Sequence, residues 1–218
     1  MSTLQWKYFL VGILLLAAVL LATLMVYPYL PHLVPTHWNL HNRANGYSPK
    51  WMLFVIVPGM MTMTMSLFLL LPWLSPKQFA VDGFEPTYLY IMVVMLGLLA
   101  YIHAVMLWAA LSAAPDVGRA ILGGLFLLFA LLGNVLGKVR RNFYLGVRTP
   151  WTLANEQVWN ATHRFAAKTF FVGGLLGLIL TAVGVQAWFL VAALMAGAIS
   201  PVAYSLIFYK RLERRGAL

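Results

Sequence analysis

Residues 133–168 hold the densest group of side chains in this chain that could take part in chemistry. Six residues of this segment are Lys or Arg, and only Glu156 is acidic. Arg148, Thr152, His163 and Arg164 together offer positive charge and hydrogen-bond donors. Such a set suits a lipid headgroup, a peptide or a protein partner. The segment therefore predicts a polar interaction surface.

A second group of candidate side chains lies in residues 31–50, where three histidines, His32, His37 and His41, fall within ten residues. Imidazole nitrogens bind zinc and related metals. However, the segment has no acidic residue, the chain has no cysteine, and prolines with an Asn-Gly step favour turns. We therefore expect a packed, hydrogen-bonded lid here, with no metal and no cofactor.

The rest of the sequence predicts an all-α polytopic membrane protein with six transmembrane helices. Of its residues, 62% are hydrophobic and only 9% are charged, whereas soluble domains have about a quarter charged residues. Apolar runs recur at the length of about 20 residues that a helix needs to cross a bilayer. The six expected spans are residues 8–27, 51–72, 87–111, 119–137, 168–185 and 187–208.

The distribution of basic residues predicts how these spans are oriented. Six spans place both termini and residues 138–168 on one side, which then holds 12 of the 15 Lys and Arg residues. The positive-inside rule assigns that side to the cytoplasm. We therefore predict a multi-pass membrane protein with both termini in the cytoplasm. The net charge of +10 is explained by topology and membrane lipids, not by nucleic acid.

An interfacial helix is expected between the fourth and fifth spans. Thr149 can cap it, and Pro150 suits the first helical position, where its missing N–H would be unpaired in any case. Trp151 and Trp159 are expected at the headgroup level, each with a half-buried ring.

Two polar residues fall within the expected spans. His103 lies in the third span, where a neutral imidazole bonded to a neighbouring helix is the favoured interpretation and a functional role the alternative. Asn134 lies near the end of the fourth span between Gly133 and Gly137, where close helix approach would let it bridge two helices.

The segment 133–168 also resembles the signature of the SdpI family of bacterial membrane proteins. The resemblance implies a six-span bundle in the bacterial cytoplasmic membrane and immunity to a membrane-active peptide toxin. In some members it implies signal relay, by holding a cytoplasmic repressor at the membrane. The matching residues are Gly133, Asn134, Asn142, the run Gly146, Val147, Arg148, Thr149, Pro150, Trp151, Thr152 and Leu153, then Trp159, Thr162, His163, Arg164 and Lys168.

Residues 31–50 resemble a domain of unknown function that often precedes the SdpI region. Asn42 stands where that module usually has a glycine, but Asn tolerates the left-handed backbone conformation. Asn45 stands where an aspartate is usual, which weakens any cation-dependent role. The matching residues are Pro35, His37, Trp38, Asn39, Gly46, Tyr47 and Lys50.

We therefore expect two parts, residues 1–72 with the external loop and residues 73–218 with the SdpI-like region, and a function without catalysis. The expected partners are membrane lipids, a peptide toxin outside and a cytoplasmic protein inside. Two alternatives stay open: a lipid or peptide transporter that uses His103, and a membrane enzyme that uses His37, His163 or a histidine-bound metal. The binding residues that we expect are Asn134, Asn142, Arg148, Thr149, Pro150, Trp151, Thr152, Trp159, His163, Arg164 and Lys168 inside, with His37, Trp38 and Asn39 outside.

Overall fold

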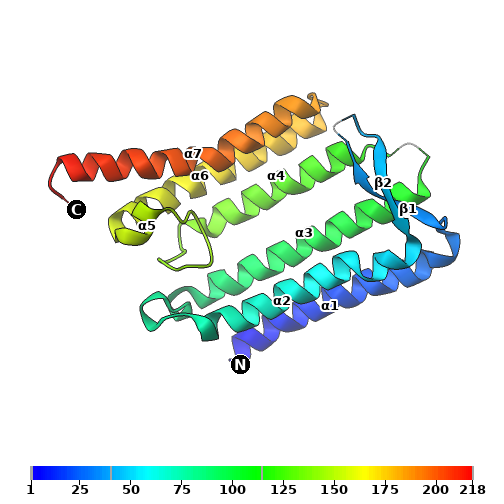
Figure 1. Cartoon of the computed structure of the whole chain (residues 1–218), viewed down its shortest axis with the longest axis horizontal. Helices are drawn as coiled ribbons and strands as arrows, with labels where there is room; N and C mark the ends of the chain where they lie inside the picture. The colour runs from blue at the N-terminus through cyan, green and yellow to red at the C-terminus, as the bar shows by residue number, and fades with distance from the viewer. Residues whose placement is uncertain (1, 40, 114, 218) are drawn as a thin grey trace.

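The structure, a computed structural model, describes residues 2–39, 41–113 and 115–217, and over these ranges it is a helical bundle (Figure 1). Six helices within the described ranges are long and apolar enough to cross a membrane, which confirms the predicted class. The helices are α1 (Thr3–Val26), α2 (Ile56–Leu74), α3 (Glu85–Leu111), α4 (Val117–Leu136), α5 (Pro150–Ala154), α6 (Glu156–Ala182) and α7 (Ala187–Arg214). Single 3-10 turns lie at Tyr27–Tyr29, Lys50–Phe54, Lys77–Phe79 and Asp82–Phe84.

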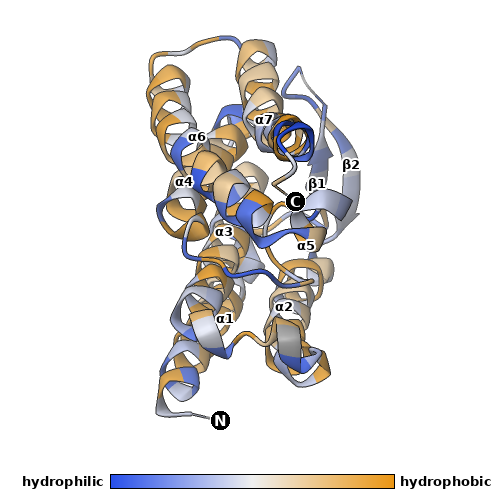
Figure 2. Ribbon diagram, turned by 90° about the vertical axis from the view of Figure 1, so that its left-hand side faces the viewer, coloured by the Kyte–Doolittle hydropathy of each residue, from blue (hydrophilic) through white to orange (hydrophobic). Residues whose placement is uncertain are grey.

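The long helices form two groups, α1–α3 and α4 with α6 and α7, which meet along α3 and α4 (Figures 1 and 2). Glycines allow close packing in the second group. A Cβ at Gly133 would overlap the backbone of α6 at Phe171, and one at Gly174 would overlap the backbone of α4 at Ala130. Close backbone approach of this kind is how helices associate where lipid gives no hydrophobic drive. The short turn between α6 and α7 uses Gly184 at φ 85°, as expected for an antiparallel helix pair.

The fifth span begins earlier than the sequence predicted. The expected interfacial helix and the span starting at residue 168 are largely one helix, α6, which begins at Glu156. The Asn155 side chain starts it by accepting hydrogen bonds from the N–H groups of Gln157 and Val158. Only α5, a five-residue helix, lies between α4 and α6.

A β-hairpin, which the sequence analysis did not predict, covers one end of the bundle. Strand β1 (Leu33–Trp38) pairs antiparallel with β2 (Ala44–Pro49). At its tip, the Asn39 side chain accepts from the N–H groups of His41 and Arg43, each at 3.0 Å. Asn42 has φ 58°, which confirms that it takes the left-handed conformation predicted for it.

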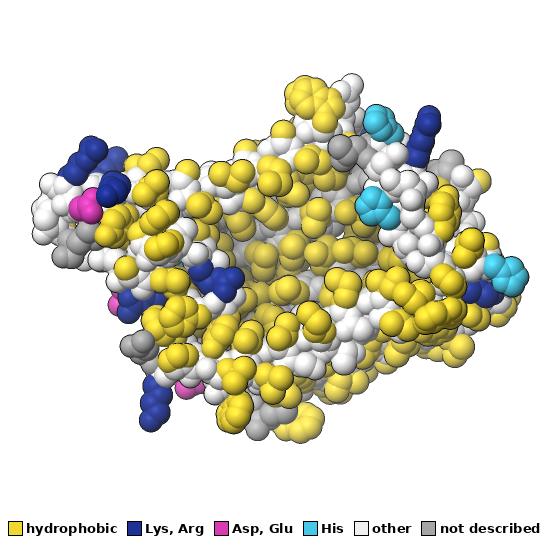
Figure 3. All heavy atoms as spheres, in the orientation of Figure 1, with side chains coloured by type: hydrophobic (Ala, Val, Ile, Leu, Met, Phe, Trp, Pro, Cys, Tyr) yellow, Lys and Arg dark blue, Asp and Glu magenta, His cyan; other side chains and the backbone are white. Residues whose placement is uncertain are grey.

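The two ends of the bundle differ in chemistry. Both termini, the loop of residues 137–149 (the basic loop) and α5 lie at one end, here named the basic end, and the hairpin lies at the other, the hairpin end (Figure 1). Figure 3 shows Lys and Arg gathered at the basic end, histidines at the hairpin end, and an apolar hollow between them.

Candidate interaction sites at the two ends

The basic loop is organised around Asn142, whose side chain is fully buried. Its Oδ1 accepts from the N–H groups of Tyr144 and Leu145, both at 2.7 Å. Its Nδ2 donates to the carbonyl oxygens of Arg140 at 2.7 Å and Leu145 at 3.3 Å. The amide is thus satisfied by loop backbone, so Asn142 shapes the loop and is not free to bind a partner.

His163 locks the far side of this loop onto α6. Its Nδ1 donates to the Trp159 carbonyl at 2.9 Å, and its Nε2 accepts from the Val147 N–H at 3.1 Å. This pattern defines a neutral ring, because only one of the two nitrogens needs a proton. The ring stacks on the indole of Trp159 at 4.0 Å between centroids. Gly146 has φ 101°, and a Cβ there would overlap His163 Nε2.

These contacts correct two predictions. Trp159 is fully buried, not half buried at the headgroup level, because its Nε1 donates to the Val139 carbonyl at 2.8 Å inside the core. His163 is 1% exposed, so it does not contribute to a polar surface. With both ring nitrogens engaged by backbone, it has no lone pair left to act as a base, which argues against an enzyme built on His163.

A hydroxyl cluster joins α5 to the loop and to α7. Thr149 and Thr152 form the predicted cap at the start of α5. Thr152 is fully buried and donates to the carbonyl oxygens of Val147 and Thr149, so it too is absent from the surface. Trp151 Nε1 donates to Ser205 Oγ on α7 at 2.5 Å. Pro150, at the first helical position, is exposed.

Besides Pro150, four expected site residues are exposed at or near the basic end: Asn134, Arg148, Arg164 and Lys168. Arg148 donates to the Phe143 carbonyl and otherwise faces outward. Asn134 was expected to bridge two helices, but its side chain is exposed because glycines, not Asn134, occupy the α4–α6 contact.

At the hairpin end, the three expected residues have different roles. His37 is exposed, and its Nδ1 lies 2.6 Å from Asn45 Oδ1 on the opposite strand. Trp38 is half buried and packs against Val105, Ala109 and Val117 of α3 and α4. Asn39 holds the hairpin tip, as described above.

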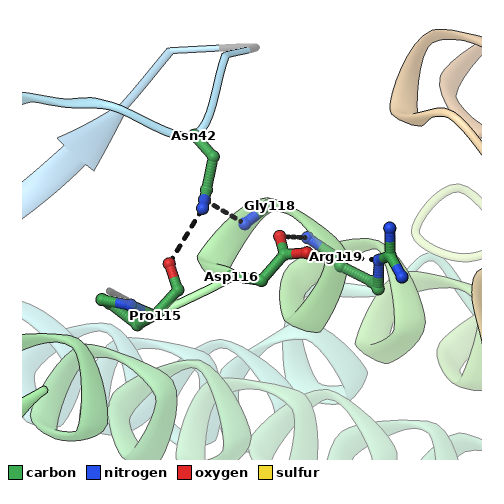
Figure 4. A network of polar contacts seen from close by, with 5 residues as sticks. All are labelled: Asn42, Pro115, Asp116, Gly118 and Arg119. Carbon is green, nitrogen blue, oxygen red and sulfur yellow. Dashed lines mark hydrogen bonds and ion pairs between the residues drawn. The ribbon is translucent and has the colours of Figure 1, made fainter. Parts of the chain in front are cut away.

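Asn42 ties the hairpin tip to the connection between α3 and α4 (Figure 4). Its Nδ2 donates to the Pro115 carbonyl at 2.8 Å, and its Oδ1 accepts from the Gly118 N–H at 2.9 Å. Asp116 caps α4 by accepting from the Arg119 N–H at 3.1 Å, and its carboxylate also lies 3.2 Å from the Arg119 guanidinium.

A cavity of about 400 Å³ lies beneath the hairpin. Helices α3, α4 and α7 supply apolar walls, and β1 with the hairpin tip supplies a rim that includes His37 and Asn39. Sites of this size with apolar walls and a few polar groups are typical of ligand binding. The wall residues include Trp38, Ile102, Met106, Ile121 and Val191.

His103 makes the inter-helix contact that was expected for it. Its Nε2 lies 2.6 Å from Thr23 Oγ1 on α1, and the residue is 1% exposed. Its Nδ1 is buried with no hydrogen-bond partner among the described residues. Within the same described ranges, no group of three or more His, Cys, Asp or Glu side chains is arranged to hold a metal ion.

Sequence reasoning missed two contacts that hold the basic end together. Ser205 gave no signal, since an isolated serine in an apolar helix has no motif around it. The Arg141 guanidinium donates to the Leu153 carbonyl at 3.1 Å and lies 5.5 Å from the Phe79 ring. Its pairing with a residue 62 positions earlier depends on the tertiary fold, so only its charge could be interpreted in advance.

Comparison with known proteins agrees with the family resemblance. Residues 138–205 match the SdpI/YfhL protein family, and residues 13–62 match a domain of unknown function, DUF1648. The chain is 27% identical over 206 residues to a Bacillus subtilis (strain 168) protein described as immunity protein SdpI, covering 93% of this chain and 96% of the relative. No solved structure matches the chain significantly.

Proposed function

Because residues 138–205 belong to the SdpI/YfhL family, we propose that this membrane protein protects a bacterium against a membrane-active peptide toxin. The observation that carries the proposal is the similarity to immunity protein SdpI along nearly the whole of both chains. A match of this extent reaches the hairpin, the basic loop and all six long helices. The similarity is therefore not confined to a single motif.

The hairpin end is the proposed place where the peptide is met. The cavity beneath the hairpin offers apolar walls for hydrophobic side chains, and His37 and Asn39 on its rim offer polar contacts. The positive-inside rule predicts that this end faces outward, the side from which a secreted peptide arrives.

The basic end is the proposed place for a cytoplasmic protein partner. Arg148 and Arg164 are exposed there, and the buried network around Asn142 and His163 holds the backbone that presents Arg148. An arginine on a rigid backbone loses less freedom on binding, which favours a specific contact.

Immunity is tested by the survival of a sensitive bacterium that expresses the protein and is challenged with membrane-active peptides. We expect protection by the natural chain and its loss in Ile121→Trp, which fills the cavity beneath the hairpin. Ile199→Trp is the matched control, because Ile199 is 57% exposed on α7 and does not line the cavity. Normal membrane levels of the natural chain without protection would overturn the proposal.

Relay is tested separately with Arg148→Ala, by comparing toxin-dependent changes in transcription in cells that express the natural chain or the variant. We expect the variant to protect the cell but to lose the transcriptional response. A response that is unchanged in both Arg148→Ala and Arg164→Ala would contradict a partner site at the basic end.

A further inference from the structure

The close contact between α4 and α6 fixes where the exposed polar residues of both helices point. A Cβ at Gly133 would overlap the Phe171 backbone nitrogen and lie 2.9 Å from the Ala167 carbonyl oxygen, and a Cβ at Gly137 would lie 3.6 Å from Ala167 Cβ. Each further residue along an α-helix turns by about 100°. Since α4 and α6 run antiparallel (Figure 1), the residues that follow Gly133 and Ala167 turn toward the same flank of the pair. Asn134 and Lys168 therefore lie on one flank at similar depth.

Two more cations extend this flank toward the basic end. Arg164 lies four residues before Lys168, so it is the next residue on the same face of α6. Lys138 lies in the turn that directly follows the end of α4 at Leu136, four residues after Asn134. All four side chains are exposed, and neither ion pair found among the described residues involves them. The nearest acid before Arg164 on α6 is Glu156, which is about 12 Å away along the axis. The four residues form a ladder of three cations and one amide.

An apolar cleft leads away from this ladder into the span. It has a volume of about 410 Å³ and lies between α3 and α4. Leu127 and Leu131 line it, and with Asn134 they are spaced i, i+4 and i+7, which places all three on one stripe of α4. The remaining wall includes Tyr90, Val93, Gly97 and Tyr101 of α3.

We propose that the ladder and the cleft bind one anionic phospholipid, with its phosphodiester at Asn134, Lys138, Arg164 and Lys168 and an acyl chain in the α3–α4 cleft. Ammonium and guanidinium groups bind phosphate oxygens through charge-assisted hydrogen bonds, and the Asn134 amide adds a neutral donor. The cations of the ladder match the charged headgroup of a lipid, and the apolar walls of the cleft match its acyl chain. The proposal shares Arg164 with the proposed partner site and Lys138 with the basic loop, but lipid binding by the purified chain is measured without toxin or partner, so the two proposals can fail separately.

The headgroup is tested by native mass spectrometry of the purified full chain with phosphatidylglycerol or phosphatidylcholine of identical acyl chains. We expect phosphatidylglycerol to bind at least ~10-fold more tightly, since each juxtamembrane cation favours anionic lipid. Lys138→Gln, Arg164→Gln and Lys168→Gln combined should abolish this preference. The control neutralises three exposed cations at the end of α7, Arg211, Arg214 and Arg215, and should keep it.

The acyl chain is tested with Leu131→Trp, which fills the cleft and should weaken phosphatidylglycerol binding by ~10-fold, while Ile199→Trp should leave it unchanged. Melting temperature and monodisperse elution show that each variant is folded. Equal binding of the two lipids, or equal loss in the ladder and α7 variants, would overturn the proposal. Displacement of the lipid by inorganic phosphate at similar concentration would also overturn it, because the cleft would then contribute nothing.

Discussion

The hairpin and the basic loop have the same structural task at opposite ends of the bundle, but they perform it in different ways. Each joins the two groups of helices. The Asn42 side chain bonds the hairpin to backbone groups just before α4 and in its first turn. Phe143 of the basic loop packs against Phe79, which lies between α2 and α3, with the two ring centroids 4.2 Å apart. The hairpin tip relies on exposed hydrogen bonds, whereas the basic loop relies on buried side chains such as Asn142 and His163.

This difference shows that one stretch of sequence can combine buried residues that fix the architecture with exposed residues that do not. In the basic loop and α6, the buried signature residues bond to backbone and fix the path of the chain. The exposed ones, Arg148, Arg164 and Lys168, lie outside the core, although Arg148 also donates to the Phe143 carbonyl, and their charged groups are accessible to a partner. At the hairpin end, the polar candidate His37 is itself exposed.

The largest effect expected is that of Gly146→Ala in the basic loop. The change forces a non-glycine residue to φ 101° and drives its Cβ into His163, which should cost about 2–5 kcal/mol. The measurement is the midpoint of thermal unfolding in detergent micelles.

Gly216→Ala is the control, because Gly216 also has positive φ, 61°, but has no atom near its missing Cβ among the described residues. It should cost only the left-handed backbone penalty, at most about 1–2 kcal/mol. Equal effects at the two glycines would mean that the contact with His163 is not what makes the loop rigid.

His163→Phe is expected to have the next largest effect. Phenylalanine keeps the stacking on Trp159 but leaves the buried Val147 N–H without an acceptor, at a cost of about 1–3 kcal/mol. Arg164→Gln, at the exposed neighbouring position, should shift stability by less than about 0.5 kcal/mol. If His163→Phe were as stable as Arg164→Gln, His163 would not be needed to hold the loop, and it would again be a candidate for binding a partner.

The sequence predicted the spans well because their signal is local. Runs such as that around Phe9 to Thr23 are apolar over the length of a span, and lipid leaves helix as the only conformation for them. The cap at Thr149 and the left-handed Asn42 were also predictable, since both depend on residues next to one another.

Burial within the signature could not be predicted, because it depends on which distant segment covers each side chain. His163 and Arg164 are adjacent and both polar, yet one accepts from the loop at Val147 and the other is exposed. The hairpin was missed for a related reason. Its strands include Pro35 and Pro49, which weaken a strand pattern, and their antiparallel pairing, from Leu33 with Pro49 to Trp38 with Ala44, depends on how the chain turns between them.

Asn42 provides a smaller test at the hairpin end. Asn42→Ala loses two exposed hydrogen bonds and strains the left-handed turn, for about 1–2 kcal/mol, while Asn42→Gly loses only the bonds. Hydrogen exchange at the Gly118 amide should accelerate in both variants. Protection of Gly118 that survives both changes would show that the hairpin is held by Trp38 alone.

The smallest effect on stability is expected for His37→Ala. This variant gives the clearest test of the contrast between an exposed binding residue at the hairpin end and the buried structural residues of the basic loop. His37 is exposed, and among the described residues its side chain bonds to Asn45 alone, so its loss should change stability by less than about 0.5 kcal/mol. If the hairpin end meets the toxin, the variant should still lose protection in the survival assay. Asn45→Ala is the matched control, since it removes the same hydrogen bond but keeps the imidazole on the rim of the cavity. A His37→Ala protein that unfolds as readily as His163→Phe would mean that the hairpin residue is architectural as well, and the contrast between the two ends would fail.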